Sequence, residues 1–255
     1  MGRGGFLKSG IYLDIENLSR NGGWGMRFDA VKEMVEAQDT IVLRANAYIA
    51  VDRHRESTDE EYREKTRGFR AAVRRNGFHI VAKEVKRYRD EYGQVVLKAN
   101  ADLDLAVDAL LQADNLDYIL LGSGDGDFLR LVRALQMRGK RVDVLGFENV
   151  SSELSLEADH YFPGALVPGL LPYVLKSPNR ARGILQNVNE KKGYGFLTSY
   201  LGPGLSDIRD DIFCHITSVT DNEAPVDNAA FAEMGRKGAI LEYDMEKQSD
   251  GRSPP

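Results

Sequence analysis

The chain has 255 residues, of which 42% are hydrophobic and 29% are charged, a composition typical of a globular protein. A formal net charge of -5 argues against strong nonspecific binding of the whole molecule to nucleic acid. The single cysteine, Cys214, excludes an internal disulfide and a four-cysteine zinc site, so we expect a protein of a reducing, cytoplasmic compartment. No apolar run reaches the ~18 residues of a membrane-spanning helix, and no membrane partner is expected.

Between residues 11 and 161, apolar segments alternate with segments of helical spacing. The expected strands are 11–15, 40–49, 78–82, 118–122 and 141–147. The expected helices are 28–36, 59–75, 101–113, 127–138 and 151–161. Strands that alternate with helices predict an α/β fold, in which a parallel sheet carries helices on both faces.

The composition changes after residue 162, where four prolines are spread through a stretch without a clear period. We therefore expect a first domain at 1–164, a linker at 165–181 and a second domain at 182–255. From Gly183 onward the residues alternate and carry Gly, Asn and Asp turn signals, which predict a small all-β module. Exposed sheet edges or the apolar stretch 166–175 could mediate a homo-oligomer, but nothing in the sequence decides this.

Positive charge is concentrated between Arg53 and Arg89, where 12 Lys and Arg residues accompany 6 Asp and Glu residues. Two interpretations of this stretch remain open. It could form a surface that meets a polyanion, or it could be a solvated helix face with ion pairs inside the helix.

Acidic side chains follow two of the expected strands directly. Asp14 comes at the end of the first strand, and Asp125 and Asp127 lie in the glycine-rich segment after the fourth. The carboxyl ends of parallel strands meet at one edge of the sheet, where open α/β sheets bind their ligands. Carboxylates suit Mg²⁺ or Mn²⁺, so a cation site is predicted there. The alternative is a strand-to-helix turn capped by one aspartate.

Three more acids fall on the expected helix 101–113. Asp102 lies in its first turn, where the helix dipole alone favours an acid. Asp104 and Asp108 are four residues apart and share a face, so they repel each other unless they face water or a cation. We favour a solvated position for Asp104 and a cation-facing position for Asp108.

Three motifs resemble the NYN domain of the LabA-like branch, which belongs to the PIN-like nucleases: residues 13–18 (LDIENL), 98–102 (KANAD) and 122–128 (GSGDGDF). The resemblance covers about residues 9–164 and implies a Rossmann-like fold and RNA cleavage with Mg²⁺ or Mn²⁺. It implies that Asp14, Asp102 and Asp125 hold the metal. It also implies that Asp108 and Asp127 are supporting acids. We include Asp108 among the predicted metal ligands as well. The implied catalytic residues are Asp14, Asn17, Asp102, Ser123, Asp125 and Asp127, of which Asn17 and Ser123 would hydrogen-bond water or phosphate at the metal.

Divalent ions can activate water and neutralise a leaving oxygen, so no side-chain nucleophile is required. Cys214 and the four histidines show no catalytic grouping, which agrees with that chemistry. Lys98, close to Asp102 in the chain, could contact an RNA phosphate or could only neutralise that carboxylate. The glycine-rich segment lacks the Lys-Ser/Thr ending of a P-loop.

Residues 183–186 (GILQ), 191–197 (KKGYGFL) and 211–215 (DIFCH) resemble a cold-shock domain, a small OB-type barrel that binds single-stranded nucleic acid. Alternation along the strands places four rings on one face, where they can stack on bases: Tyr194, Phe196, Phe213 and His215. Lys191 and Lys192 can meet phosphates. A role for the rings in the barrel core is the alternative. Asn187 and Val188 stand where the family usually has an aromatic pair, and the barrel could be incomplete because the chain ends early.

These patterns together predict a metal-dependent endoribonuclease that hydrolyses phosphodiester bonds of single-stranded RNA, held by the C-terminal module. The alternative is a noncatalytic RNA-binding regulatory protein, in which the acids bind a structural cation or none. A small-molecule phosphohydrolase is a third interpretation, because a fold can host many functions.

Overall fold

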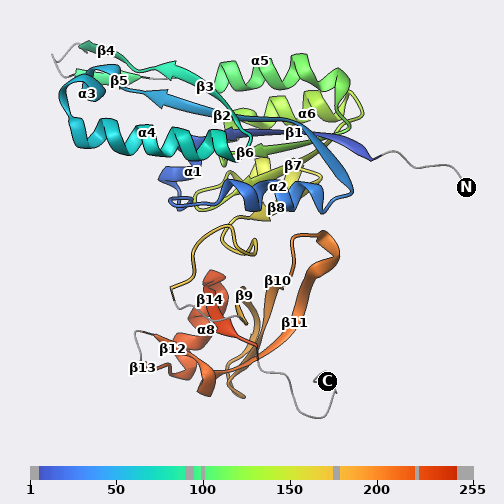
Figure 1. Cartoon of the computed structure of the whole chain (residues 1–255). Coiled ribbons are helices and arrows are strands. Elements are labelled where there is room, and N and C mark those ends of the chain that lie inside the picture. Colours follow the sequence, from blue (N-terminus) through green and yellow to red (C-terminus); the bar gives the residue numbers. More distant parts are fainter. Residues whose placement is uncertain (1–5, 90–94, 99–100, 175–178, 222–223, 246–255) are drawn as a thin grey trace, which may run out of the picture. The chain divides into compact units, whose positions relative to one another are not determined.

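The computed structural model describes residues 6–89, 95–98, 101–174, 179–221 and 224–245, and for 86–89 and 95–98 it describes the backbone alone. The chain forms two compact units that divide between Gly164 and Ala165 (Figure 1). Each unit has its own main sheet. The N-terminal unit contains the acids predicted to hold a cation, and the C-terminal unit contains the rings predicted to stack on RNA.

A six-stranded parallel sheet forms the centre of the N-terminal unit. Its strands are β1 (Leu7–Asp14), β2 (Thr40–Val51), β3 (His79–Glu84), β6 (Tyr118–Gly122), β7 (Arg141–Gly146) and β8 (His160–Pro163). They lie in the order β3-β2-β1-β6-β7-β8, and every neighbouring pair is parallel. The direction of winding reverses between β1 and β6, so this is the switch point at which such sheets bind ligands.

Helices cover both faces of this sheet, as the alternation predicts. They are α1 (Ile15–Arg20), α2 (Phe28–Glu36), α3 (Arg53–Thr58), α4 (Glu60–Arg75), α5 (Asp102–Gln112), α6 (Leu129–Gln136) and α7 (Ser152–Glu157). α2 and α4 pack on one face, where the ring centroids of Phe28 and Phe69 are 6.0 Å apart (Figure 1). α5 and α6 pack on the other face, where Leu105 and Leu131 share a core with Tyr12. β6 is buried along its whole length because both of its faces are covered.

Besides β8, four short helices and strands among the described residues of this unit are absent from the predicted set. They are α1, α3, and the antiparallel strands β4 (Lys86–Arg89) and β5 (Val95–Lys98). Each has only four to six residues, which is too short to give a periodic signal. Side-chain caps start both helices: Asp14 accepts from the Asn17 N–H at 3.1 Å, and Asp52 accepts from the Arg55 N–H at 3.0 Å.

The expectation of a helix over 151–161 is wrong in its last part. α7 ends at Glu157, and residues 160–163 form β8 beside β7. The Asp159 carboxylate accepts from the Val142 N–H at 2.7 Å, and the Asp159 N–H donates to the Val142 carbonyl at 2.9 Å. These long-range bonds turn the chain into the sheet, and sequence periodicity cannot report them.

The main sheet of the C-terminal unit is antiparallel. Its strands are β9 (Arg180–Asn189), β10 (Tyr194–Tyr200), β11 (Ile208–His215) and β14 (Ile240–Asp244), in the order β11-β10-β9-β14. A two-stranded pair, β12 (Thr220–Asp221) and β13 (Ala224–Pro225), accompanies it. Within the described part of this unit, no pairing of β11 with β14 closes the sheet, so the OB-type barrel is not confirmed and stays a prediction.

The prediction that this module is all-β is wrong, because it contains α8 (Asn228–Lys237). Asp227 caps the helix by accepting from the Ala230 N–H at 2.8 Å, and Gly238 ends it with φ 61°. Phe231 is fully buried and joins Leu185 in the core against the sheet. The Asp cap, the helically spaced apolar residues and the final glycine could have predicted α8 from the sequence.

The described part of the predicted linker 165–181 is packed rather than free. Leu166, Val167 and Leu170 are buried. The Arg182 guanidinium donates to the Pro172 carbonyl at 2.6 Å and lies 4.7 Å from the Tyr173 ring centroid. Residues 165–174 therefore belong structurally to the C-terminal unit, and β9 begins within the predicted linker, at residue 180.

Candidate functional site

The switch point brings the ends of β1 and β6 together. Leu13 pairs with Gly122, so Asp14 and Ser123 come next to each other at the carboxyl edge of the sheet. A Cβ at Gly122 would lie 2.5 Å from Leu13 Cδ2, so any other residue at this position would displace the Leu13 side chain. Helix α5 begins with Asp102, and the 3₁₀ turn Gly126–Phe128 begins after Asp125. We call Asp14, Asp102, Asp125 and Asp127 the acidic edge.

Asp14 is the most enclosed member of the acidic edge, with only 7% of its surface exposed. Its Oδ1 accepts from the Asn17 N–H at 3.1 Å, and its Oδ2 accepts from the Ser123 hydroxyl at 3.3 Å. Burial raises the pKa of Asp14 to about 6, and the charge of Asp102 raises it as well, although both hydrogen bonds lower it. Among the described residues, no positively charged side chain offsets this rise in the pKa of Asp14.

Ser123 and Asn17 fix the loops that surround Asp14. Ser123 is fully buried, and its hydroxyl accepts from the Asp125 N–H at 3.2 Å. The Asn17 side-chain oxygen accepts from the Gly124 N–H at 2.8 Å, which ties α1 to the loop after β6. Both residues thus lie beside Asp14, where they orient protein groups, and their contact with water or phosphate at a metal stays a prediction.

The remaining acids repel one another across the same edge. Asp102 is half-buried, and burial raises its pKa; the charges of Asp125, Asp127 and Glu16 raise the pKa further. Asp125 accepts from the Asp127 N–H at 2.9 Å, so one of the two loop acids caps the turn and the other is exposed. Glu16 belongs to this electrostatic group but is missing from the predicted set, although its position two residues after Asp14 could have indicated it.

The donor set fits a hard divalent cation that keeps much of its water. Mg²⁺ is usually bound through one or two carboxylates with several waters, and the acidic edge offers carboxylate oxygens only. In the searched part of the chain, no group of three or more His, Cys, Asp or Glu residues forms a ready-made metal cage. A bound cation would stabilise the charged form of Asp14 and Asp102 and would therefore lower their raised pKa values.

The structure separates Asp108 and Asp104 from the acidic edge. Asp108 follows Asp102 by six positions on α5, a separation of about 9 Å along the helix axis. Asp108 accepts from the Tyr48 hydroxyl at 2.9 Å, and Asp104 accepts from the Lys83 ammonium at 2.8 Å. Asp108 as a metal ligand stays a prediction, but its described partner is a phenol of the sheet. The Lys98 side chain lies outside the described residues.

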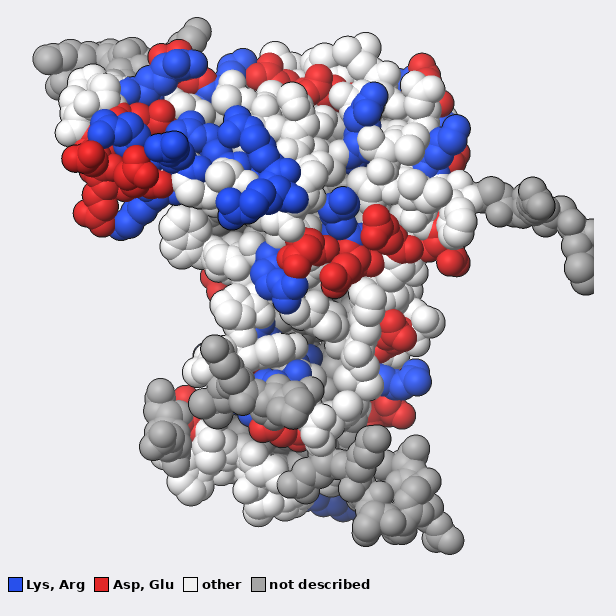
Figure 2. Space-filling model, viewed as in Figure 1, with Lys and Arg blue, Asp and Glu red and all other residues white. Residues whose placement is uncertain are grey.

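The basic stretch predicted at 53–89 follows α3 and α4. Figure 2 shows Lys and Arg side chains gathered over α4, with acids toward the α3 end. Ion pairs run inside α4, from Lys65 to Glu61 at 2.6 Å and from Arg63 to Glu60 at 3.4 Å. These pairs favour the solvated-face interpretation for this part of the stretch, and contact with a polyanion stays a prediction.

The four predicted stacking residues form one continuous cluster in the C-terminal unit. The ring centroids of Tyr194, Phe196 and Phe213 are 5.8 to 6.1 Å apart, and His215 stacks on Phe213 at 6.4 Å. Phe213 is 47% exposed, whereas the core residues Leu185 and Leu197 are buried. The rings are therefore not core residues. We call these four residues the aromatic face; Lys191 and Lys192 are exposed in the turn between β9 and β10.

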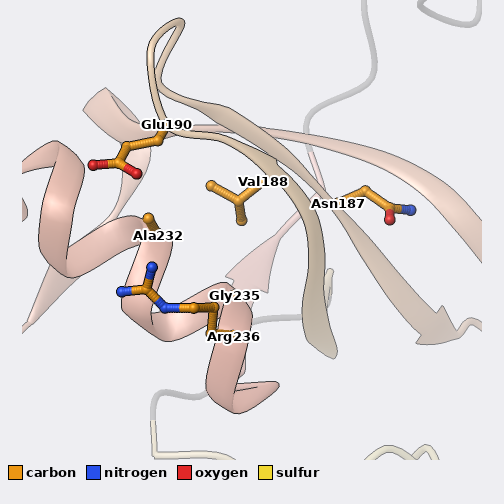
Figure 3. Close-up of a pocket in the computed structure, with 6 residues that line it drawn as sticks. All are labelled: Asn187, Val188, Glu190, Ala232, Gly235 and Arg236. Atoms are coloured by element: carbon orange, nitrogen blue, oxygen red, sulfur yellow. The ribbon is translucent and has the colours of Figure 1, made fainter.

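A small pocket of about 280 Å³ lies between β9 and α8 (Figure 3). It is lined by Asn187, Val188, Glu190, Ala232, Gly235 and Arg236. None of the residues predicted to bind RNA lines it, and the Arg236 guanidinium is paired with Glu233 at 2.6 Å. We assign it no ligand.

No helix among the described residues is long and apolar enough to cross a membrane. The family comparison matches residues 8–168, more than half of the chain, to the NYN domain. This range contains the whole acidic edge.

Two relatives agree with this match. The chain is 31% identical over 98 residues to "Low amplitude and bright protein LabA" from Synechococcus elongatus; this covers 37% of the chain and 53% of LabA, so the chain spans about half the length of that relative. A crystal structure of a protein of unknown function from Vibrio parahaemolyticus matches with a TM-score of 0.53 and 28% identity, over 64% of this chain and 96% of that one. The chain therefore belongs to the NYN-domain family, which is part of the PIN-like nuclease superfamily.

Proposed function

We propose that this protein is a metal-dependent endoribonuclease that hydrolyses phosphodiester bonds of single-stranded RNA. The observation that carries the proposal is the acidic edge at the switch point, where carboxylates of three different segments repel one another and two have raised pKa values. A site built to bind a divalent cation and a phosphate has this electrostatic character. Membership of the NYN family makes nuclease chemistry the first choice for such a site.

Asp14, Asp102 and Asp125 would hold Mg²⁺ or Mn²⁺, with Asp127 beside them. When bound, the cation supplies Lewis-acid chemistry: it lowers the pKa of water and neutralises charge on the phosphate and the leaving oxygen. The chain supplies position. The Asn17 N–H and the Ser123 hydroxyl hold the two oxygens of Asp14, and the bond from Gly124 to Asn17 keeps the loop of Asp125 in place.

The C-terminal unit would hold the RNA strand. Its aromatic face offers rings to bases, and Lys191 and Lys192 offer charge to phosphates. This arrangement supports binding without strong sequence preference, because every base has a face that can stack.

The test is incubation of the full chain with labelled single-stranded RNA in Mg²⁺, in Mn²⁺ and in EDTA, beside Asp125→Asn. We expect cleavage by the wild-type chain with either metal, none in EDTA, and retained RNA binding by the inactive variant. If both proteins bind RNA and neither cleaves it, the nuclease proposal fails. The second candidate, a noncatalytic RNA-binding regulator, then takes its place; the absence of a ready-made metal cage among the searched residues favours it.

Replacing Phe213 by Ala is expected to weaken RNA binding about 5- to 100-fold, because stacking contributes roughly 1 to 3 kcal/mol per base. Phe213 is 47% exposed and outside the core, so the fold should persist. Fluorescence anisotropy with labelled RNA in EDTA measures the effect. Val174→Ala, at an 86% exposed position whose N–H bonds to Glu242 of β14, is the control. Equal affinity of both variants and wild type would remove the aromatic face from the binding site.

A further inference from the structure

Trp24 is the only tryptophan of the chain, and 78% of its surface is exposed. Single exposed apolar residues are common and by themselves indicate nothing. Trp24 differs because the loop that carries it, residues 21–26, is fixed in place at the carboxyl edge of the sheet. Packing of the tryptophan ring does not explain why the loop is fixed, because the ring itself is exposed.

The loop is closed by its own backbone. The Gly23 N–H donates to the Leu18 carbonyl at 2.8 Å, and the Met26 N–H donates to the Gly23 carbonyl at 3.1 Å. Gly22 and Gly25 have φ values of 100° and 80°, which favour glycine. Met26 is buried, so the chain is anchored directly after the exposed ring.

The same loop is bonded to the segment that follows β7. The Glu148 N–H donates to the Asn21 carbonyl at 2.8 Å, and the Asn149 side chain donates to the Asn21 side-chain oxygen at 3.1 Å. A Cβ at Gly23 would lie 2.5 Å from the Phe147 ring, so the loop packs on this segment as closely as glycine allows.

That segment is in turn bonded to the acidic edge. The Ser151 N–H donates to the Gly124 carbonyl at 2.9 Å, while the Gly124 N–H donates to the Asn17 side chain at 2.8 Å. The Asn17 N–H donates to the Asp14 carboxylate, and Gly124 precedes Asp125. One hydrogen-bonded frame therefore carries both Trp24 and the acids.

The surroundings of the ring select its ligand. Glycines at 22, 23 and 25 add no side chain beside the indole, and no other large apolar residue in 21–26 is exposed. One ring is far too small for a stable protein interface, which buries roughly 800 Å² on each partner. An indole with an open face suits a single planar ring, and a nucleobase is such a ring.

We propose that Trp24 forms a base-binding subsite, in which the indole stacks on one nucleobase of single-stranded RNA beside the acidic edge. The inference rests on the proposed function for its choice of RNA. It adds a contact in the N-terminal unit that is independent of the aromatic face. A base held here would fix which phosphodiester of the strand lies at the acids.

The test uses the intrinsic fluorescence of the full chain, because Trp24 is the only tryptophan. EDTA keeps the RNA intact. Titration with oligouridine should quench the emission as binding saturates, whereas inorganic polyphosphate, which has charge but no bases, should not. Trp24→Ala should weaken oligouridine binding about 5- to 100-fold by anisotropy, and Trp24→Phe should restore most of the affinity. Met137→Ala, at an 88% exposed position, is the control variant and should bind as wild type.

The outcomes separate this inference from the nuclease proposal. Quenching by RNA in a protein that never cleaves it overturns the nuclease and supports the subsite. Metal-dependent cleavage with unquenched emission at saturation, or with unchanged affinity of Trp24→Ala, overturns the subsite alone. Equal quenching by polyphosphate also overturns it, because Trp24 would then report charge rather than stacking. Absence of any RNA binding overturns both.

Discussion

Asp14→Asn is expected to lower the rate of metal-dependent RNA cleavage by about 10²- to 10³-fold, the range for loss of one charge-stabilising group. Asp14 is buried at the switch point, and the two hydrogen bonds that it accepts hold its carboxylate in place. Asn keeps the shape and can still accept from the Asn17 N–H, but it cannot neutralise a cation. Single-turnover cleavage and anisotropy of the same RNA measure the rate and the affinity separately, and affinity should change little.

Asp104→Asn is the matched control, because it makes the same change from acid to amide on a neighbouring element. Asp104 pairs with Lys83 at 2.8 Å outside the acidic edge, so cleavage should stay within about threefold of wild type. An equal loss in both variants would mean that cleavage depends on net charge alone. Full activity of Asp14→Asn would remove Asp14 from the site.

The same substitution, Asp14→Asn, is also expected to stabilise the fold at neutral pH in EDTA. Burial raises the pKa of Asp14 from an ordinary 3.8 to about 6, so the folded protein holds the proton more tightly than the unfolded chain. Wild-type stability from this group is therefore greatest below about pH 4 and is lost as pH rises through 6. The variant, which is neutral throughout, should gain about 1 to 3 kcal/mol over wild type at pH 8 and little at pH 4.

Urea unfolding at both pH values measures this difference. Saturating Mg²⁺ should reverse it at pH 8, because a cation that binds only the folded wild type stabilises it by about 2.7 kcal/mol at a hundredfold excess over Kd. Asp104→Asn should show neither effect. A variant that is less stable than wild type at pH 8 in EDTA would show that the charge of Asp14 is compensated within the protein. Stability sacrificed at a functional group is common in binding sites.

Much of the N-terminal unit could be predicted from the sequence. Helices 28–36 and 59–75 follow from the helical spacing of their apolar residues, and the strand 118–122 follows from its short, continuous apolar run. The sequence also placed Asp14 and Asp125 at one edge, because Asp14 ends β1, Asp125 lies in the loop after β6, and parallel strands end together. The predicted aromatic face appears for the same reason: alternate residues of a strand share a face.

The errors have different causes. The missed elements of four to six residues were too short to give a periodic signal, whereas α8 carried local signals that could have indicated it. The end of α7 and strand β8 depend on a partner far away in the chain, because Val142 bonds to Asp159. Local patterns cannot report such a contact. Asp108 shows the same limit, because its spacing on α5 agrees with a cation ligand, while its partner Tyr48 is set by the packing of α5 on β2.

The sequence by itself determined the alternation of strands and helices, the acids at the strand ends and the alternation of rings along β10 and along β11, because these depend on residues close together in the chain. Only the tertiary structure decided which acids come together, how deeply Asp14 is buried and where Trp24 lies. Burial and electrostatic repulsion arise between segments that are distant in sequence, as in the contact of Asp14 with Ser123. The same folding that removes Asp14 from water raises its pKa and brings the other acids close to it.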